Sequence, residues 1–190
     1  MTVSIGPGAF VAVVGASGVG KDTLLVAAHA RCVDSVFFPR RAITRPPGPG
    51  EDHSPLTELE FATSRDRGDF AICWRAHGLD YAIPTSADHA IRAGHVVVAN
   101  ISRGILDDLS GRYERVVVVR ITVSDDVRAA RLRARHRETA DDIARRLERK
   151  DPGRDHKVDY EISNDGAVED ASAELLRIIE LHVDEQMGTA

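Results

Sequence analysis

The chain has 190 residues, of which 43% are hydrophobic, and its formal net charge is −5 at pH 7. This length fits one domain, or one core with small inserted lobes. The negative charge argues against nucleic acid as a partner, because the phosphate backbone attracts a cationic surface. The N-terminus has neither a Lys/Arg-rich start nor a long apolar run, so we expect no signal peptide and no membrane span. Cys32 and Cys73 lack metal-ligand spacing and indicate reduced thiols in a cytoplasmic protein.

A glycine-rich loop at residues 15–23 follows a strand expected at 10–14 and leads into a helix expected at 22–30. Its Gly-x-x-x-x-Gly-Lys spacing is that of a phosphate-binding loop. Glycines let the backbone approach a phosphate closely, consecutive N–H groups form an anion site, and Lys21 can reach the β- and γ-phosphates. A chance glycine-rich turn is the alternative, but the spacing, the lysine and both flanking elements agree. We therefore expect ATP to bind at Gly15, Ala16, Ser17, Gly18, Val19, Gly20, Lys21, Asp22 and Thr23.

Asp22 stands where such loops usually have Ser or Thr, whose hydroxyl holds Mg²⁺. A carboxylate is also a good Mg²⁺ ligand, although it repels naked triphosphate. We expect Asp22 to contact the metal directly or through water.

A basic, irregular stretch follows a short strand expected at residues 36–38. The prolines and glycines at 46–50 exclude helix and most strand. Arg40, Arg41 and Arg45 lie just before them, and Arg binds phosphate bidentately. We favour an anion clamp over the alternative of a solvated loop.

A small lobe of alternating elements comes next. It is expected to hold a helix at 56–67, a strand at 70–74, a turn at 77–80 and a return strand at 81–83. His77 is interpreted first as a turn residue, with ligand binding as the less favoured alternative. Tyr81 could donate its hydroxyl to a phosphate or could simply pack.

The second half begins with a helix expected from Thr85 or Ser86 to residue 93, and then a continuous apolar run at 95–99, typical of a central parallel strand. Asn100, Ser102 and Arg103 follow its carboxyl end, where ligands bind in open α/β sheets. For Ser102, a helix cap is an equally weighted interpretation.

A further strand is expected at 115–123, and Ser124 opens a helix that runs into an arginine-rich break. A second helix starting near residue 139 makes this segment a candidate mobile lid, with a solvated basic helix face as the alternative. A strand at 157–162, a turn at 164–166 and an amphipathic helix close the chain.

Five strand-like runs thus alternate with helices, which predicts an α/β P-loop fold: a five-stranded parallel sheet flanked by helices on both faces. We expect one kinase domain with its core at 1–38, 94–130 and 151–190, an inserted acceptor-binding lobe at about 39–93, and a lid at about 131–150.

Several short motifs occur together along almost the whole chain. They are Lys21-Asp22-Thr23, Arg41-x-Ile43-Thr44-Arg45-Pro46, Glu51-x-His53, Glu60-Phe61, Trp74-x-x-x-Gly78-x-x-Tyr81, Asn100-x-Ser102-Arg103 and Arg131-Leu132-x-x-Arg135-x-Arg137-Glu138. In this combination the chain resembles the ribose 1,5-bisphosphate phosphokinases, a phosphonate-degradation branch of the guanylate-kinase-like kinases.

The resemblance implies ATP- and Mg²⁺-dependent phosphorylation of ribose 1,5-bisphosphate to 5-phospho-α-D-ribose 1-diphosphate in phosphonate catabolism. It implies a catalytic set of Lys21, Arg135 and Arg137. It extends the ATP-binding set to Arg131, Asn164 and Asp165. The implied acceptor-binding set is Arg41, Arg45, Glu51, Tyr81, Asn100, Ser102, Arg103 and Arg146.

The main alternative is a guanylate kinase or another nucleoside monophosphate kinase. Guanylate kinases place a second arginine three residues after the first, where this chain has Gly48, and read guanine with Glu and Ser where it has Ile72 and Arg41. A non-catalytic binding module is less favoured, because the loop and lid arginines are both present. A GTPase or ATPase switch lacks a water-positioning motif. The expected partners are small molecules, and a homodimer is left open.

Overall fold

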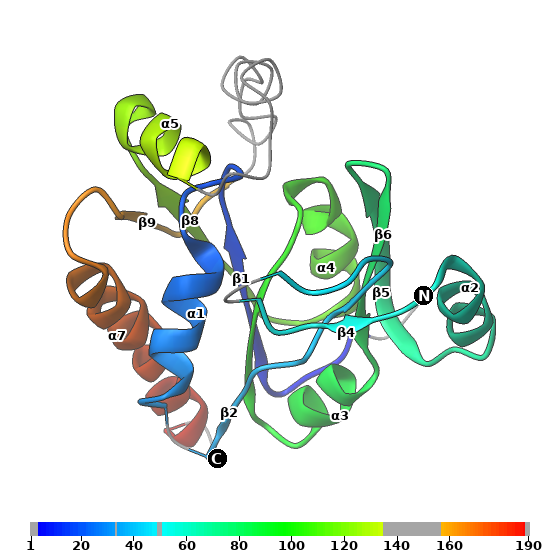
Figure 1. Cartoon of the computed structure of the whole chain (residues 1–190). Helices are drawn as coiled ribbons and strands as arrows, with labels where there is room; N and C mark the ends of the chain where they lie inside the picture. The colour runs from blue at the N-terminus through cyan, green and yellow to red at the C-terminus, as the bar shows by residue number, and fades with distance from the viewer. Residues whose placement is uncertain (1–3, 33, 49–50, 135–156, 189–190) are drawn as a thin grey trace.

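The computed structural model describes residues 4–32, 34–48, 51–134 and 157–188. Its main sheet has five strands in the order β2-β7-β1-β8-β9, and every neighbouring pair is parallel (Figure 1). The predicted α/β fold class is therefore confirmed. The strand bounds are Ala9–Val14 for β1, Val36–Phe37 for β2, Val96–Asn100 for β7, Val116–Thr122 for β8 and Tyr160–Ser163 for β9.

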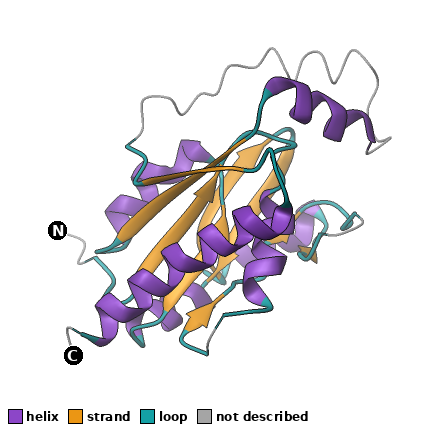
Figure 2. Cartoon of the chain, turned by 90° about the vertical axis from the view of Figure 1, so that its left-hand side faces the viewer, coloured by secondary structure: helices purple, strands orange, loops and turns teal. Residues whose placement is uncertain are grey.

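Both faces of this sheet are covered, as the continuous apolar runs require. In β1, Val11 and Val13 pack into one hydrophobic cluster with residues of α1 (Lys21–His29) and α7 (Val168–Met187). Phe10, Ala12 and Val14 point to the opposite cluster, with residues of α3 (Ser86–Arg92) and α4 (Leu106–Arg112). Figure 2 shows helices lying across the near face of the sheet. Successive side chains of one strand thus fill two cores.

A second sheet has the order β4-β3-β6-β5 and carries helix α2 (Glu58–Asp66). Ala42 of this sheet packs with Phe61 and Ala82 in a third, smaller cluster. The bounds are Ala42–Ile43 for β3, Ser54–Pro55 for β4, Phe70–Ala76 for β5 and Leu79–Pro84 for β6. Strand β3 was not predicted from the sequence, because its two residues form a strand only by pairing with β6 and β4.

Several boundary predictions were wrong in detail. The turn expected at 77–80 is limited to residues 77 and 78, because β6 starts at Leu79. Strand β9 starts at Tyr160 rather than at residue 157. Thr85 precedes α3, but its side chain makes no capping hydrogen bond, so the expected side-chain cap does not form there. Helix α2, in contrast, starts with a capping box between Thr57 and Glu60.

A buried ionic contact ties α3 to the end of α4. Asp88 is 4% exposed, and its Oδ1 accepts hydrogen bonds from Arg112 Nε at 3.0 Å and from the Tyr113 hydroxyl at 2.8 Å. Burial alone would raise the pKa of Asp88, but these hydrogen bonds and the nearby guanidinium hold that pKa below its ordinary value. In the part of the chain that the structure describes, no helix is both long and apolar enough to cross a bilayer.

Candidate active site

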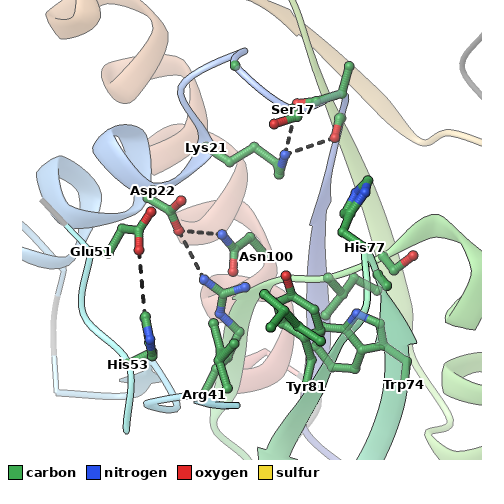
Figure 3. A pocket seen from close by; sticks show the side chains of 18 of the residues that line it. Ser17, Lys21, Asp22, Arg41, Glu51, His53, Trp74, His77, Tyr81 and Asn100 are labelled. Atoms are coloured by element: carbon green, nitrogen blue, oxygen red, sulfur yellow. Dashed lines mark hydrogen bonds and ion pairs between the residues drawn. The ribbon is translucent and has the colours of Figure 1, made fainter. Parts of the chain in front are cut away.

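The glycine-rich loop joins β1 to α1 and adopts backbone conformations that favour glycine. Gly15 has φ 150°, and a Cβ there would lie 2.5 Å from the carbonyl oxygen of Ile121. Gly20 has φ 94°, and a Cβ there would lie 2.6 Å from Asn164 Nδ2. Lys21 folds back over the loop, where its Nζ donates to the carbonyl oxygens of Gly15 at 2.8 Å and Ala16 at 3.1 Å (Figure 3). The loop has the compact form that a phosphate site requires.

The side chain of Asn164, which directly follows β9, and side chains from α5 (Asp125–Ala134) hold the carbonyl groups of this loop. Asn164 is 1% exposed and donates from Nδ2 to the carbonyl oxygen of Val19 at 2.8 Å. Arg131 donates to the carbonyl oxygens of Val19 at 3.3 Å and Asn164 at 2.8 Å. Arg128 Nε donates to the carbonyl oxygen of Ser17 at 3.0 Å. Two of the residues expected to bind ATP thus brace the loop that would bind it.

Asp22 connects the loop helix to two other elements. Its Oδ1 accepts hydrogen bonds from Arg41 Nη2 at 3.1 Å and from Asn100 Nδ2 at 2.5 Å (Figure 3). The Arg41 side chain is only 16% exposed. Burial lowers the pKa of Arg41, and the Asp22 carboxylate partly offsets this shift. The contact places a buried cation next to the phosphate loop.

Arg45 is held by a carboxylate on its own loop. Its Nη1 lies 2.6 Å from Glu51 Oε2, which also accepts a hydrogen bond from the Gly48 backbone N–H at 3.0 Å. The hydrogen bond to Glu51 raises the pKa of Arg45. His53, which is 1% exposed, shares a hydrogen bond of 3.0 Å between its Nε2 and the Arg45 carbonyl oxygen. Glu51 therefore orients Arg45.

The hairpin of β5 and β6 forms the wall opposite the loop. Trp74 and Tyr81 stack with their ring centroids 5.3 Å apart and an interplanar angle of 10° (Figure 3). Ile72 is 7% exposed, packs in the core and is not among the residues that line the cavity, and its correspondence with a guanine-reading side chain stays a prediction. Trp74 and Ala76 are the residues of β5 that line the cavity.

One cavity of about 670 Å³ brings these groups together, a volume within the ordinary range for ligand sites. Most predicted donor-site and acceptor-site residues line it: Gly15, Ala16, Ser17, Gly18, Gly20, Lys21, Asp22, Arg41, Arg45, Glu51, Tyr81, Asn100, Ser102 and Arg103. Val19, Thr23, Arg131, Asn164 and Asp165 are not among its lining residues. Asp165 instead accepts hydrogen bonds from the Ser124 backbone and side chain, both at 2.7 Å. The predictions for Arg135, Arg137 and Arg146 lie outside the described residues.

Ser102 and Arg103 come from the segment that follows β7. The Ser102 hydroxyl accepts a hydrogen bond from the Gly104 backbone N–H at 3.4 Å, so Ser102 both caps helix η1 (Arg103–Ile105) and lines the cavity. Burial lowers the pKa of Arg103, and Arg120 and Arg128 lower it further. Arg128 also lines the cavity, and sequence reasoning missed it. Arginine recurs so often in this helix that no single position stood out.

The sequence of this chain is similar to those of known proteins. The chain is 60% identical over 179 residues to the ribose 1,5-bisphosphate phosphokinase PhnN of Pseudofrankia inefficax, covering 94% of each protein. This chain belongs to the ribose 1,5-bisphosphate phosphokinase family. The family member from Bradyrhizobium diazoefficiens is 46% identical and covers 93% of this chain, which in turn spans 90% of that relative. No protein-family model matches the chain.

The fold of this family member extends to more distant kinases. A crystal structure of guanylate kinase from Anaplasma phagocytophilum matches it with a TM-score of 0.66, over 98% of this chain and 89% of that one. The two sequences are 18% identical, so this likeness concerns the fold alone.

Proposed function

We propose that the protein transfers the γ-phosphoryl group of ATP to the 1-phosphate of ribose 1,5-bisphosphate. An acceptor phosphate oxygen forms a bond to the γ-phosphorus, and the bond from that phosphorus to the β–γ bridging oxygen breaks. The products are 5-phospho-α-D-ribose 1-diphosphate and ADP, which keeps the bond's electron pair. The observation that carries the proposal is one cavity lined by both the phosphate loop and the Arg41–Arg45 segment, in a chain 60% identical to a named family member.

On the donor side, the loop N–H groups and Lys21 bind the β- and γ-phosphates. The donor set fits Mg²⁺, because this ion keeps several waters and needs only one or two carboxylates besides the substrate phosphates. Asp22 is the carboxylate beside Lys21, and among the described residues no group of three His, Cys, Asp or Glu side chains forms a denser metal site. The ion would neutralise phosphate charge; Asp22 would hold it directly or through water.

On the acceptor side, Arg41 and Arg45 grip the sugar phosphate, with Tyr81, Asn100, Ser102 and Arg103 around it. A phosphate oxygen is already anionic at neutral pH, so the reaction requires no general base. The difficulty is repulsion between two highly negative substrates. Catalysis then consists of positioning and charge neutralisation. We propose that Arg135 and Arg137 neutralise the charge of the transferring phosphoryl group and that Arg146 contacts the acceptor.

A guanylate kinase is the second candidate, because the fold is shared with one. We place Arg41 at the position of the guanine-reading serine of guanylate kinases, and Arg41 contacts Asp22. A cation there suits an acceptor with a second phosphate, whereas a base would lose a polar partner.

We further propose that the enzyme works in the cytoplasm, in phosphonate catabolism. Cys32 and Cys73 are free cysteines, which favours a reducing compartment. The residues proposed to bind ATP and those proposed to bind the acceptor come from one chain, so the proposed reaction needs no residue from a second copy.

The proposal is tested by identifying the product. Purified protein is incubated with ATP, Mg²⁺ and ribose 1,5-bisphosphate, and the mixture is followed by ³¹P NMR. We expect the monophosphate resonance of carbon 1 to be replaced by the coupled pair of a diphosphate while ADP accumulates in equal amount. ADP accompanied only by inorganic phosphate would show hydrolysis and overturn the proposal.

A further inference from the structure

The tip of the β5–β6 hairpin is a tight turn with an uncommon residue. Ala76 pairs with Leu79, so only His77 and Gly78 form the turn. Their φ angles are 54° and 76°, as a type I′ turn requires at both central positions. Among the described residues, His77 is the one non-glycine residue with positive φ. Asn or Gly meets this geometry at lower cost than His, so the turn by itself does not explain the imidazole.

The rest of the hairpin holds this tip against the cavity. The Trp74–Tyr81 stack lies below the turn, and the Thr44 hydroxyl accepts a hydrogen bond of 2.9 Å from the Asp80 backbone N–H. His77 itself lines the cavity, as do Ser17 and Lys21 on the far side. In Figure 3 the His77 ring points from the hairpin tip toward the end of the cavity where these two residues lie. The strained residue therefore sits where its side chain can meet a ligand.

The chemistry of the cavity restricts what that ligand atom can be. Lys21, Arg41, Arg45, Arg103 and Arg128 all line the space that His77 faces. Such a concentration of cations selects an anion, and the neutral and the protonated imidazole both offer an N–H donor. A phosphoryl oxygen meets both requirements, because it is anionic and it accepts a hydrogen bond from the imidazole N–H.

We propose that His77 is a substrate-contacting residue that donates an N–H from the hairpin tip to a phosphoryl oxygen of the bound sugar phosphate. This rests on the proposed kinase activity. The left-handed backbone conformation is what directs the ring into the cavity, and strain of this kind concentrates at ligand-binding positions.

Two substitutions separate the imidazole from the turn. His77→Gly keeps the backbone conformation at no steric cost and removes the donor, whereas His77→Asn keeps both a tolerated left-handed conformation and an N–H donor. Steady-state kinetics with varied ribose 1,5-bisphosphate are compared at saturating ATP. We expect His77→Gly to lose about tenfold or more in kcat/KM for the sugar phosphate, as loss of a hydrogen bond to a charged group predicts, and His77→Asn to lose no more than about threefold.

Arg75 offers a matched control on the same hairpin, because it is exposed and does not line the cavity. Arg75→Ala should keep the wild-type kcat/KM, and the thermal midpoint of His77→Gly should stay near that of the wild type. Wild-type kinetics in His77→Gly, or an equal loss in His77→Asn, would overturn the role of the imidazole. An inactive wild-type protein would instead overturn the proposed reaction, so the two failures are distinguishable.

Discussion

Arg41 offers the sharpest test of how the acceptor is held. Replacing Arg41 by Met keeps a side chain of similar length and removes the charge and all the N–H donors. The Arg41 side chain is 16% exposed and its guanidinium already contacts Asp22 at 3.1 Å, so Arg41 is prepositioned beside the phosphate loop. We expect Arg41→Met to raise the KM for ribose 1,5-bisphosphate and to change the KM for ATP by less than about threefold.

The size of the effect follows from the contact that is lost. Hydrogen bonds to charged groups contribute about 1.5–3 kcal/mol each, and about 1.4 kcal/mol corresponds to a factor of ten. One such contact to the acceptor phosphate therefore predicts a rise in KM of roughly 10- to 150-fold. The folding cost should be small, because Asp22 keeps its hydrogen bond from Asn100 and is itself 42% exposed.

The neighbouring Arg40 provides the control for charge alone. Arg40 pairs with Asp52 at 2.7 Å on the surface, and both side chains are more than half exposed. Arg40→Met removes the same charge one residue away but none of the cavity lining. An ADP-release assay on both variants, with thermal unfolding as a check on folding, decides the matter. Equal KM values for the two variants would refute the reasoning.

Three further predictions concern the metal, the core and the loop. Asp22→Asn should raise the Mg²⁺ concentration for half-maximal activity by about tenfold, because a charged ligand is lost; an unchanged Mg²⁺ titration contradicts this. Asp88→Asn should cost roughly 2–3 kcal/mol in urea unfolding at pH 7, since Arg112 loses its buried partner. The folded-state pKa of Asp88 is lowered. The difference in the free energy of unfolding between the wild type and Asp88→Asn should therefore vanish as the pH falls below about 4, where Asp88 becomes protonated. Gly20→Ala should cost about 1–2 kcal/mol in the same assay and weaken ATP binding, because φ is 94°; Gly166→Ala, which meets open space, should do neither.

Much of the fold follows from local patterns in the sequence. The apolar runs of β1, β7 and β8 are long enough to identify buried parallel strands, and their ends fall within one or two residues of the predicted ones. Strand β3 could not be found in this way, because Ala42–Ile43 is too short to show a period and pairs with partners distant in sequence.

The site was predictable where a motif carries its own chemistry. The glycine spacing predicted a phosphate loop, and the arginines before residues 46–50 predicted a second group of cations; Lys21, Arg41 and Arg45 from these two segments line one cavity. Contacts between distant segments could not be predicted from the sequence. Asn164 and Arg128, for example, donate hydrogen bonds to carbonyl groups of the loop that are more than 100 positions away. The contact between Asp22 and Arg41 was likewise not predictable from the sequence, because it joins α1 to the residue that precedes β3.

We propose above all that the cavity selects an acceptor with two phosphates over an acceptor that carries a nucleobase. A coupled ADP-release assay with ribose 1,5-bisphosphate and GMP, run side by side on the same protein at saturating ATP, measures this selection directly. We predict a kcat/KM for ribose 1,5-bisphosphate that far exceeds the value for GMP. An equal or higher kcat/KM for GMP would contradict the account.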